Sequence, residues 1–210
     1  MKIYDISMLI EPDMMVYKDK ESKKPGFTVV SSHENSVAHE TELCVNLHTG
    51  THIDMPLHMI AEGKTLDTFD YKRLITPCKV FDLTYLEEPV IKVSDIQDLP
   101  IQKDDFILFK TKNSYRKKEE GFDYDFVYLD EEGARLLRDL EVNGVGIDAL
   151  GIERAQENHM THILLLQDDI IILEGLQLAE VPEGNYELIA LPIKIKGVEA
   201  SLVRAVLLDK

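Results

Sequence analysis

Residues 48–58 of this chain, HTGTHIDMPLH, place three histidines and one aspartate within eleven positions. Imidazole nitrogens and carboxylate oxygens are the ligands that zinc and manganese take at hydrolytic sites in proteins. The whole sequence contains only seven histidines, so random placement explains this density poorly. The segment therefore predicts a metal centre.

The spacing within this segment favours an extended conformation. His52 and Asp54 are two residues apart, so in a strand their side chains point to the same face. His48 can join them if Gly50 permits a local bend or bulge. The rival interpretation is a helix with both histidines on one face, as in the zincins. Gly50 and Pro56 disfavour such a helix.

The remaining histidines lack this clustering. A lone histidine is more often a hydrogen-bonded core residue than a metal ligand, and we interpret His33, His39 and His159 as core residues.

Composition limits the classes of protein to which the chain can belong. A length of 210 residues suits one well-buried core, and no repeat or linker divides it, so we expect a single domain over residues 1–210. The net charge of −16 argues against a nucleic-acid partner, because phosphate binding needs a basic surface. No apolar run approaches the ~18 residues of a membrane span.

The cysteines and the N-terminal residues indicate a compartment. Cys44 and Cys78 are too few for a disulfide framework, and we expect both to be buried free thiols. The first residues lack the cationic and apolar regions of a secretory signal. We therefore expect a cytoplasmic protein.

Hydrophobic patterning predicts a mixed α/β fold with more strand than helix. Short runs rich in β-branched or aromatic residues predict nine strands: 3–9, 27–32, 41–47, 79–83, 106–110, 145–148, 170–173, 186–193 and 203–208. We expect three helices: a short one opened by a capping box at Ser94, one from a cap at Asp130 through Glu141, and one that holds His162.

Residues 112–125 are dense in charged and aromatic side chains. We expect them to form a solvated surface loop. A lid or a dimer-contact loop is the alternative.

The segment HTGTHIDMPLH resembles the signature His-x-Gly-Thr-His-x-Asp-x-Pro-x-His of the cyclase family, which includes bacterial kynurenine formamidases and isatin hydrolases. The resemblance covers nearly the whole chain and continues at these residues: 5–7, 146–148, 162, 172–176, 191–193 and 203–206. It implies a swivelling β/β/α domain that is commonly dimeric, and we expect a homodimer or a higher homo-oligomer.

The resemblance also implies roles for individual residues. His48, His52 and Asp54 match the first metal ligands of the family, and Asp54 is expected to bridge two divalent cations. His162 and Glu174 match the ligands that complete the second site. Zinc is the expected metal because it suits mixed nitrogen and oxygen ligands, and manganese is the alternative.

His58, the last residue of the motif, matches the residue that accepts and donates the proton in this family. It could return that proton to the departing nitrogen, which amide cleavage requires. His159 competes with His162 as a ligand, being three residues away, and the family spacing to Glu174 favours His162.

The implied activity is hydrolysis of a C–N amide bond in a small, aromatic substrate. An arylformamidase that converts N-formylkynurenine to kynurenine and formate is the leading specific prediction. Ring opening of a cyclic amide, as in the isatin hydrolases, is the alternative. A non-catalytic metal- or ligand-binding protein is the third possibility, and the intact His58 weighs against it.

The chain departs from the family where the substrate is expected to bind. Kynurenine formamidases carry a bulky aromatic residue followed by Pro-Gly near the N-terminus. Here Tyr17 keeps the aromatic ring, and Lys18 and Asp19 replace Pro-Gly. Gly151 lies where the family usually has a serine. We expect Tyr17 to line an apolar substrate pocket, together with Met14, Met15 and Phe27.

Overall fold

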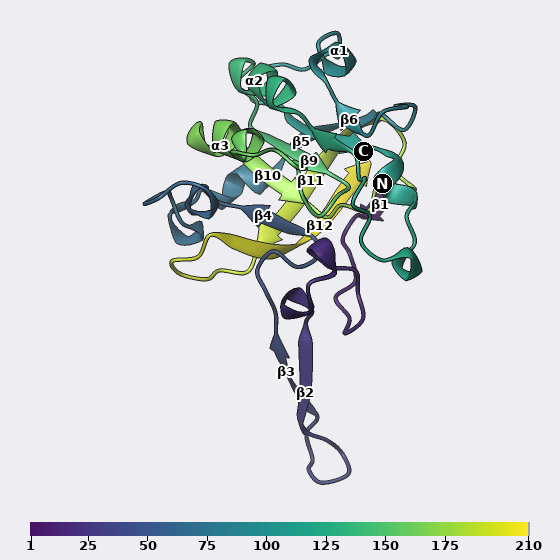
Figure 1. Ribbon diagram of the computed structural model, residues 1–210. Coiled ribbons are helices and arrows are strands. Elements are labelled where there is room, and N and C mark those ends of the chain that lie inside the picture. The colour runs from purple at the N-terminus through teal and green to yellow at the C-terminus, as the bar shows by residue number, and fades with distance from the viewer. Residues whose placement is uncertain (210) are drawn as a thin grey trace.

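The computed structural model describes residues 1–209, and most of its strands form one sheet that closes on itself (Figure 1). The strands are β1 (Lys2–Asp5), β2 (Gly26–Ser31), β3 (Glu40–Cys44), β4 (His52–Asp54), β5 (Ile75–Asp82), β6 (Val90–Ile91), β7 (Phe106–Lys110), β8 (Tyr128–Leu129), β9 (Gly144–Ile147), β10 (Ile171–Glu174), β11 (Gly184–Pro192) and β12 (Ala200–Asp209).

The order in the large sheet is β1-β12-β11-β5-β7-β9-β10-β4, and β12 also pairs with β4. The strands from β12 round to β4 therefore form a closed, barrel-like sheet, and β1 extends it beside the C-terminal half of β12. Every predicted strand has a counterpart in the structure, with ends that differ by a few residues. The strand-rich α/β prediction is confirmed.

Three α-helices are present among residues 1–209: α1 (Val93–Ile96), α2 (Glu131–Asp139) and α3 (Met160–Gln167). Asp130 caps α2 as predicted, accepting the Gly133 N–H at 2.7 Å. The helix ends before Glu141, which has a left-handed φ of 55°. The capping box of α1 starts at Lys92 and not at Ser94, because Asp95 accepts the Lys92 N–H.

The central strands are buried on both faces, and each face has its own core. Along β7, Phe106 and Leu108 belong to the core inside the closed sheet, whereas Ile107 and Phe109 belong to the core beneath the helices. The parallel pairing of β7, β9 and β10, which has a layer on each face, explains why these three strands are buried along their whole length.

Strands β2 and β3 form a hairpin that projects from the body of the molecule (Figure 1). Its Cys44 is exposed, so the prediction of a buried thiol is wrong there, since the hairpin has no second layer to cover it. Cys78 is buried as expected, and burial raises the pKa of its thiol to about 12. His33 and His39 are also exposed, in the hairpin loop, and are not core residues.

Residues 112–125 are only partly a surface loop. Tyr115 and Tyr124 are exposed, but Asn113, Ser114 and Phe122 are buried. The prediction of a solvated loop is therefore wrong at both ends of the segment, where polar and aromatic side chains find partners in the body. No helix among the described residues is long and apolar enough to cross a membrane.

Candidate metal centre and its pocket

The pairing of β4 with β10 brings together side chains that lie far apart in the sequence. His52 is directly opposite Glu174 in the register, and Asp54 is opposite Ile172. Because Ile53 and Leu173 belong to the core inside the closed sheet, their neighbours His52, Asp54 and Glu174 face the helix-covered side. The extended conformation predicted for residues 52–54 is thus confirmed.

A tight bend before β4 places His48 beside these residues. Gly50 has a φ of +67°, a conformation that favours glycine, and the bend predicted there is confirmed. The bend packs against Gly175, where a Cβ would lie only 2.4 Å from the Gly50 carbonyl oxygen. The Thr51 hydroxyl donates to the Gly175 carbonyl at 2.6 Å, and the Gly50 carbonyl lies 2.8 Å from Nδ1 of His52. The latter contact turns Nε2 of His52 toward the carboxylates.

Asp54 lies at the centre of the cluster. Its Oδ1 is 2.9 Å from Nδ1 of His48 and 3.6 Å from Nε2 of His52. Its Oδ2 is 3.7 Å from Nε2 of His162, which comes from α3. Glu174 closes the ring, with one oxygen 3.4 Å from Nε2 of His52 and the other 3.3 Å from Nε2 of His162. The five predicted metal ligands are therefore neighbours in the structure.

The donor atoms of this cluster fit a cation. Nε2 of His52 and both carboxylate oxygens of Asp54 are buried, and within residues 1–209 none of them has a hydrogen-bond partner. Leaving buried polar atoms unsatisfied is costly, and a bound divalent cation would satisfy all three. Two groups of possible ligand atoms share Asp54, one with His48 and His58 and the other with His52 and Glu174.

The carboxylates of the cluster are held in their charged form. Burial opposes ionisation of Glu174, but contacts with His162 and His52 outweigh it and lower the pKa of Glu174 well below its usual range. Burial and Glu174 raise the pKa of Asp54, yet His48 and His52 outweigh both and lower it. Burial likewise disfavours the charged form of His162, but Glu153 and Glu174 raise its pKa to about 10. A proton on His162 thus offsets part of the carboxylate charge when no cation is bound.

His58 lies at the edge of the cluster in a 3₁₀ turn over Pro56–His58. Its ring centroid is 4.1 Å from that of His48 and 5.7 Å from that of His162. Burial lowers the pKa of His58, and the neighbouring His48 and His162 act in the same direction against Asp54. A neutral imidazole at pH 7 can accept a proton. The same position is also within reach of a cation held by His48 and Asp54.

The sequence did not identify Glu153, which contacts the ring and the backbone N–H of His162. Its Oε2 lies 3.3 Å from Nδ1 of His162 and accepts the His162 backbone N–H at 3.2 Å. Its other oxygen pairs with His159, whose side chain is 60% exposed and is not the core residue we expected. No motif marks Glu153, because its partner lies nine positions away on another element.

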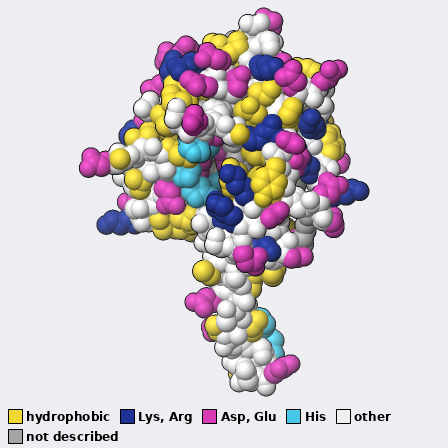
Figure 2. Space-filling view, viewed as in Figure 1, with side chains coloured by type: hydrophobic (Ala, Val, Ile, Leu, Met, Phe, Trp, Pro, Cys, Tyr) yellow, Lys and Arg dark blue, Asp and Glu magenta, His cyan; other side chains and the backbone are white. Residues whose placement is uncertain are grey.

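A cavity of about 550 Å³ opens over the cluster. Figure 2 shows histidine side chains in a hollow that Lys or Arg side chains border. Tyr17 lines this cavity as expected, and so does Gly151. A Cβ at Gly151 would lie 3.2 Å from Cε2 of Tyr17, so the missing serine leaves room for the tyrosine ring. The ring packs edge-on against Phe122, with centroids 5.1 Å apart.

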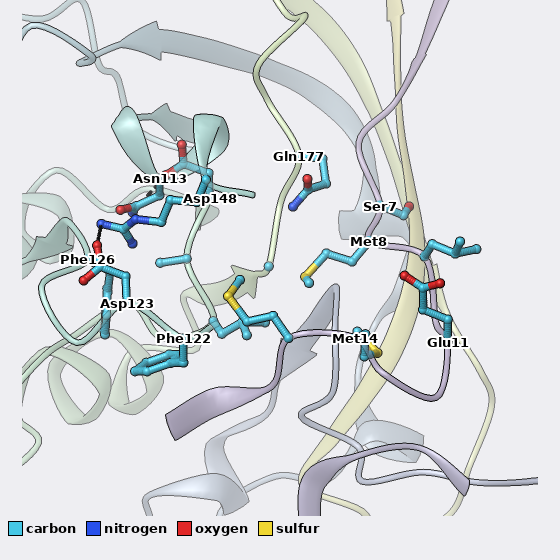
Figure 3. A pocket seen from close by; sticks show the side chains of 16 residues that line it. Ser7, Met8, Glu11, Met14, Asn113, Phe122, Asp123, Phe126, Asp148 and Gln177 are labelled. Atoms are coloured by element: carbon cyan, nitrogen blue, oxygen red, sulfur yellow. Dashed lines mark hydrogen bonds and ion pairs between the residues drawn. The ribbon is translucent and has the colours of Figure 1, made fainter. Parts of the chain in front are cut away.

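Met14 and Met15 line a different, smaller cavity of about 210 Å³, shown in Figure 3. Phe27 lies on β2 of the hairpin, away from both cavities. The expectation that these three residues share a pocket with Tyr17 is not supported. The acidic residues of the smaller cavity are engaged: Asp123 pairs with Arg116, Asp148 accepts hydrogen bonds from neighbouring backbone and side-chain groups, and Glu11 also has a partner.

Comparisons with known proteins agree with this arrangement. A sequence model of the cyclase family matches residues 4–154. The kynurenine formamidase of Salinibacter ruber is 33% identical over 210 residues, which cover 100% of this chain and 98% of that protein. A solved structure described as a potential metal-dependent hydrolase with cyclase activity is 45% identical, with a TM-score of 0.92 over 100% of this chain and 98% of the other. Isatin hydrolase A of Labrenzia aggregata has the same fold at 21% identity, with a TM-score of 0.85 over 100% and 94% of the two chains.

Proposed function

Because the chain belongs to the cyclase family, we propose that it is a metal-dependent hydrolase that cleaves a C–N amide bond in a small substrate. The observation that carries this proposal is that His48, His52, His162 and Glu174 line one cavity and lie around the buried Asp54. A bound cation would satisfy Nε2 of His52 and both oxygens of Asp54, which are buried without a hydrogen-bond partner among the described residues, and the cavity leaves room for a substrate above them.

Two divalent cations that share Asp54 are our proposal for the bound state. Asp54 would be shared between two groups of ligand atoms, one with His48 and His58 and the other with His52 and Glu174. We assign His58 to proton transfer and add His162, whose Nε2 lies 3.3 Å from Glu174, to the second group. Zinc suits these imidazole and carboxylate ligands best, and manganese is the alternative. When bound, the cations would polarise the substrate carbonyl and lower the pKa of a water molecule.

His58 is proposed as the residue that moves the proton. It is neutral at pH 7 because burial lowers its pKa, so it can accept a proton from the attacking water. The departing nitrogen needs a proton to leave as an amine, and the charged His58 can return it. The position of His58, beside His48 and His162 at the edge of the cavity, suits this exchange.

An aryl formamide such as N-formylkynurenine is the leading candidate substrate, since the chain is similar to kynurenine formamidases over its whole length. Tyr17 offers an aromatic surface to such a substrate from the side of the cavity. We also propose a cytoplasmic location and a homodimer. The projecting hairpin, with no layer packed on it in the chain described here, supports the homodimer.

Metal analysis combined with turnover tests the proposal. The purified protein is loaded with zinc or manganese, its metal content is measured, and hydrolysis of N-formylkynurenine, formanilide and isatin is followed. We expect up to two cations per chain and cleavage of at least one formamide. The double variant His52→Ala/Asp54→Ala should lose both metal and activity. Full metal retention in that variant, or no metal in the wild type, contradicts the proposed centre. Turnover of isatin alone would select the ring-opening reaction.

A further inference from the structure

Two lysines stand at the cavity above the candidate metal centre. Lys18 and Lys23 both line it, and the ammonium groups lie 5.2 Å and 5.3 Å from the ring centroid of Tyr17. Lys23 is half-buried, whereas Lys18 is exposed. The chain as a whole is acidic, with a net charge of −16, so two lysine ammonium groups at the opening of one cavity are an exception.

The fold fixes Lys23 to the metal-binding segment. The Thr49 hydroxyl, next to His48, donates to the Lys23 backbone carbonyl at 2.8 Å. A 3₁₀ turn over Glu21–Lys23 ends at this residue. The lysine is therefore positioned by the same segment that supplies the metal ligands, and its place relative to them is set by structure.

Among the described residues Lys18 and Lys23 form no ion pair with a carboxylate, and Glu174 and Asp54 of the candidate metal centre attract the Lys23 ammonium only from farther away. The adjacent Lys24 shows the contrast, because it pairs with Glu21 at 2.9 Å and does not line the cavity. Half-burying an ammonium group without a carboxylate partner is unfavourable, so a structural role alone explains Lys23 poorly. The cation–π contacts with Tyr17 offset only part of that cost.

The metal centre does not need these lysines to balance its charge. Two divalent cations would supply four positive charges to ligand candidates that include only two carboxylates, Asp54 and Glu174. The nearby Glu153 is already occupied by His159 and His162. Glu157 also lines the cavity, but it is exposed and comes from a different segment. The ammonium groups of Lys18 and Lys23 are therefore available to bind a ligand.

We propose that the substrate carries a carboxylate near its scissile amide, either directly on the ring or, as in N-formylkynurenine, at the end of the neighbouring ring substituent. Lys23, assisted by Lys18, binds this carboxylate while Tyr17 packs against the apolar part. This inference rests on the proposed amide hydrolysis and specifies the substrate class. A single-charged carboxylate suits an ammonium group flanked by an aromatic ring. The lysines select the substrate and are not assigned a part in bond cleavage.

A matched pair of substrates tests the proposal. 2-Formamidobenzoate carries a carboxylate next to the formamide, and 2-formamidobenzamide has nearly the same shape without the charge. The metal-loaded wild type should prefer the carboxylate in kcat/KM. In Lys23→Met, which keeps the apolar stem, this preference should fall about 10–100-fold, mostly through KM, because a charge-assisted hydrogen bond is lost. Lys23→Arg should keep most of the preference, and Lys24→Met should not change it.

A binding measurement separates this inference from the proposed function. Calorimetry of the metal-loaded protein with 2-aminobenzoate and 2-aminobenzamide reports the preference for the carboxylate without any turnover. Weaker binding of 2-aminobenzoate in Lys23→Met supports the lysine site even if no formamide is cleaved, an outcome that would overturn amide hydrolysis instead. Cleavage of both formamides with the same preference in wild type and Lys23→Met overturns the carboxylate site and leaves the hydrolase intact.

Discussion

At the scale of single residues, the candidate metal centre depends on positive charge lying next to the buried carboxylate of Asp54. Asp54 is buried, and its oxygens lie 2.9 Å from His48, 3.6 Å from His52 and 3.7 Å from His162, three of the four other proposed ligands. Such a carboxylate is tolerated only where positive charge surrounds it. The proton on His162 helps to meet that need when no cation is bound, and a cation would replace it on binding.

The variant His58→Ala separates the two roles that the position of His58 allows. If His58 moves the proton, the variant should retain its metal and lose about 10²–10⁴-fold in kcat, the usual contribution of general acid–base catalysis. If His58 is a ligand, metal content should fall together with activity. Metal analysis, melting temperature and kcat on the one variant distinguish these outcomes. Full metal content with near-normal kcat would remove the proposed mechanism.

The pKa of His58 predicts a pH dependence. Burial lowers this pKa in the folded protein, so the neutral, proton-accepting form persists to pH values below the ordinary ~6.5 of histidine. Activity should therefore hold through neutral pH and decline only on the acidic side of pH ~6.5. Metal content measured across the same range is the control. A decline that begins well above pH 7 while the metal stays bound would contradict the assignment.

Glu153 should act as a positioning residue for His162. The substitution Glu153→Gln removes the charge that orients the imidazole, and we expect metal affinity to weaken about 10–100-fold, as for other carboxylate–histidine–metal arrangements. Glu157→Gln, an exposed neighbour, serves as the control. Competition with a chelator measures the affinity directly. A lower melting temperature in Glu153→Gln with unchanged metal affinity would show a purely structural role.

At the scale of elements, the centre is assembled where the bend before β4 meets the end of β10. Strand β4 is only three residues long and is held on both sides, by β10 and by β12. Gly50 and Gly175 touch each other at this junction, and both have positive φ. Close backbone contact is what allows His52 and Glu174 to face the same space.

Two glycine variants measure the importance of this contact. Gly175→Ala places a Cβ 2.4 Å from the Gly50 carbonyl, whereas Gly197→Ala has a similar φ of +72° with nothing within 4 Å. Both should lose about 1–2 kcal/mol to the left-handed conformation. Gly175→Ala should lose clearly more in the free energy of unfolding and should also bind metal more weakly. Equal losses in chemical denaturation would show that the contact relaxes without consequence.

At the scale of the whole molecule, the hairpin is the feature that the rest of the chain does not explain. Phe27 and Leu43 are paired across its strands, and Val29 lies two residues from Phe27 on the same face. These side chains are 42%, 47% and 57% exposed, respectively. A two-stranded hairpin is marginally stable alone, so packing against a second copy of the chain would stabilise it.

Disrupting this apolar face should dissociate the proposed homodimer. The wild type should sediment at twice its 24.0 kDa mass, and the double variant Val29→Glu/Leu43→Glu should sediment as a monomer. Tyr85→Glu, at an apolar residue elsewhere on the surface that is 65% exposed, is the control. Sedimentation of the wild type as a monomer at micromolar concentration would exclude the proposed role of the hairpin.

The sequence predicted the strands and the local shape of the motif with few errors. Hydrophobic runs depend only on residues that are close in the sequence, so they can be recognised without the tertiary structure. They predicted both ends of β7, residues 106–110, correctly. Errors arose where burial depends on distant segments. Cys44 looked like a core thiol but lies on an uncovered hairpin, and residues 112–125 looked solvated but contribute buried side chains to the body.

The sequence by itself determined the types of ligand and their local direction, because two-residue spacing in a strand and a glycine bend are set by backbone geometry over a few residues. Placing Glu174 opposite His52 required the register of β4 against β10, which packing across the whole sheet decides. The same holds for Glu153 beneath His162 and for Lys23 at the opening of the cavity. No local pattern marks such residues, because their partners are brought near only when the closed sheet and its covering helices bury their apolar faces together.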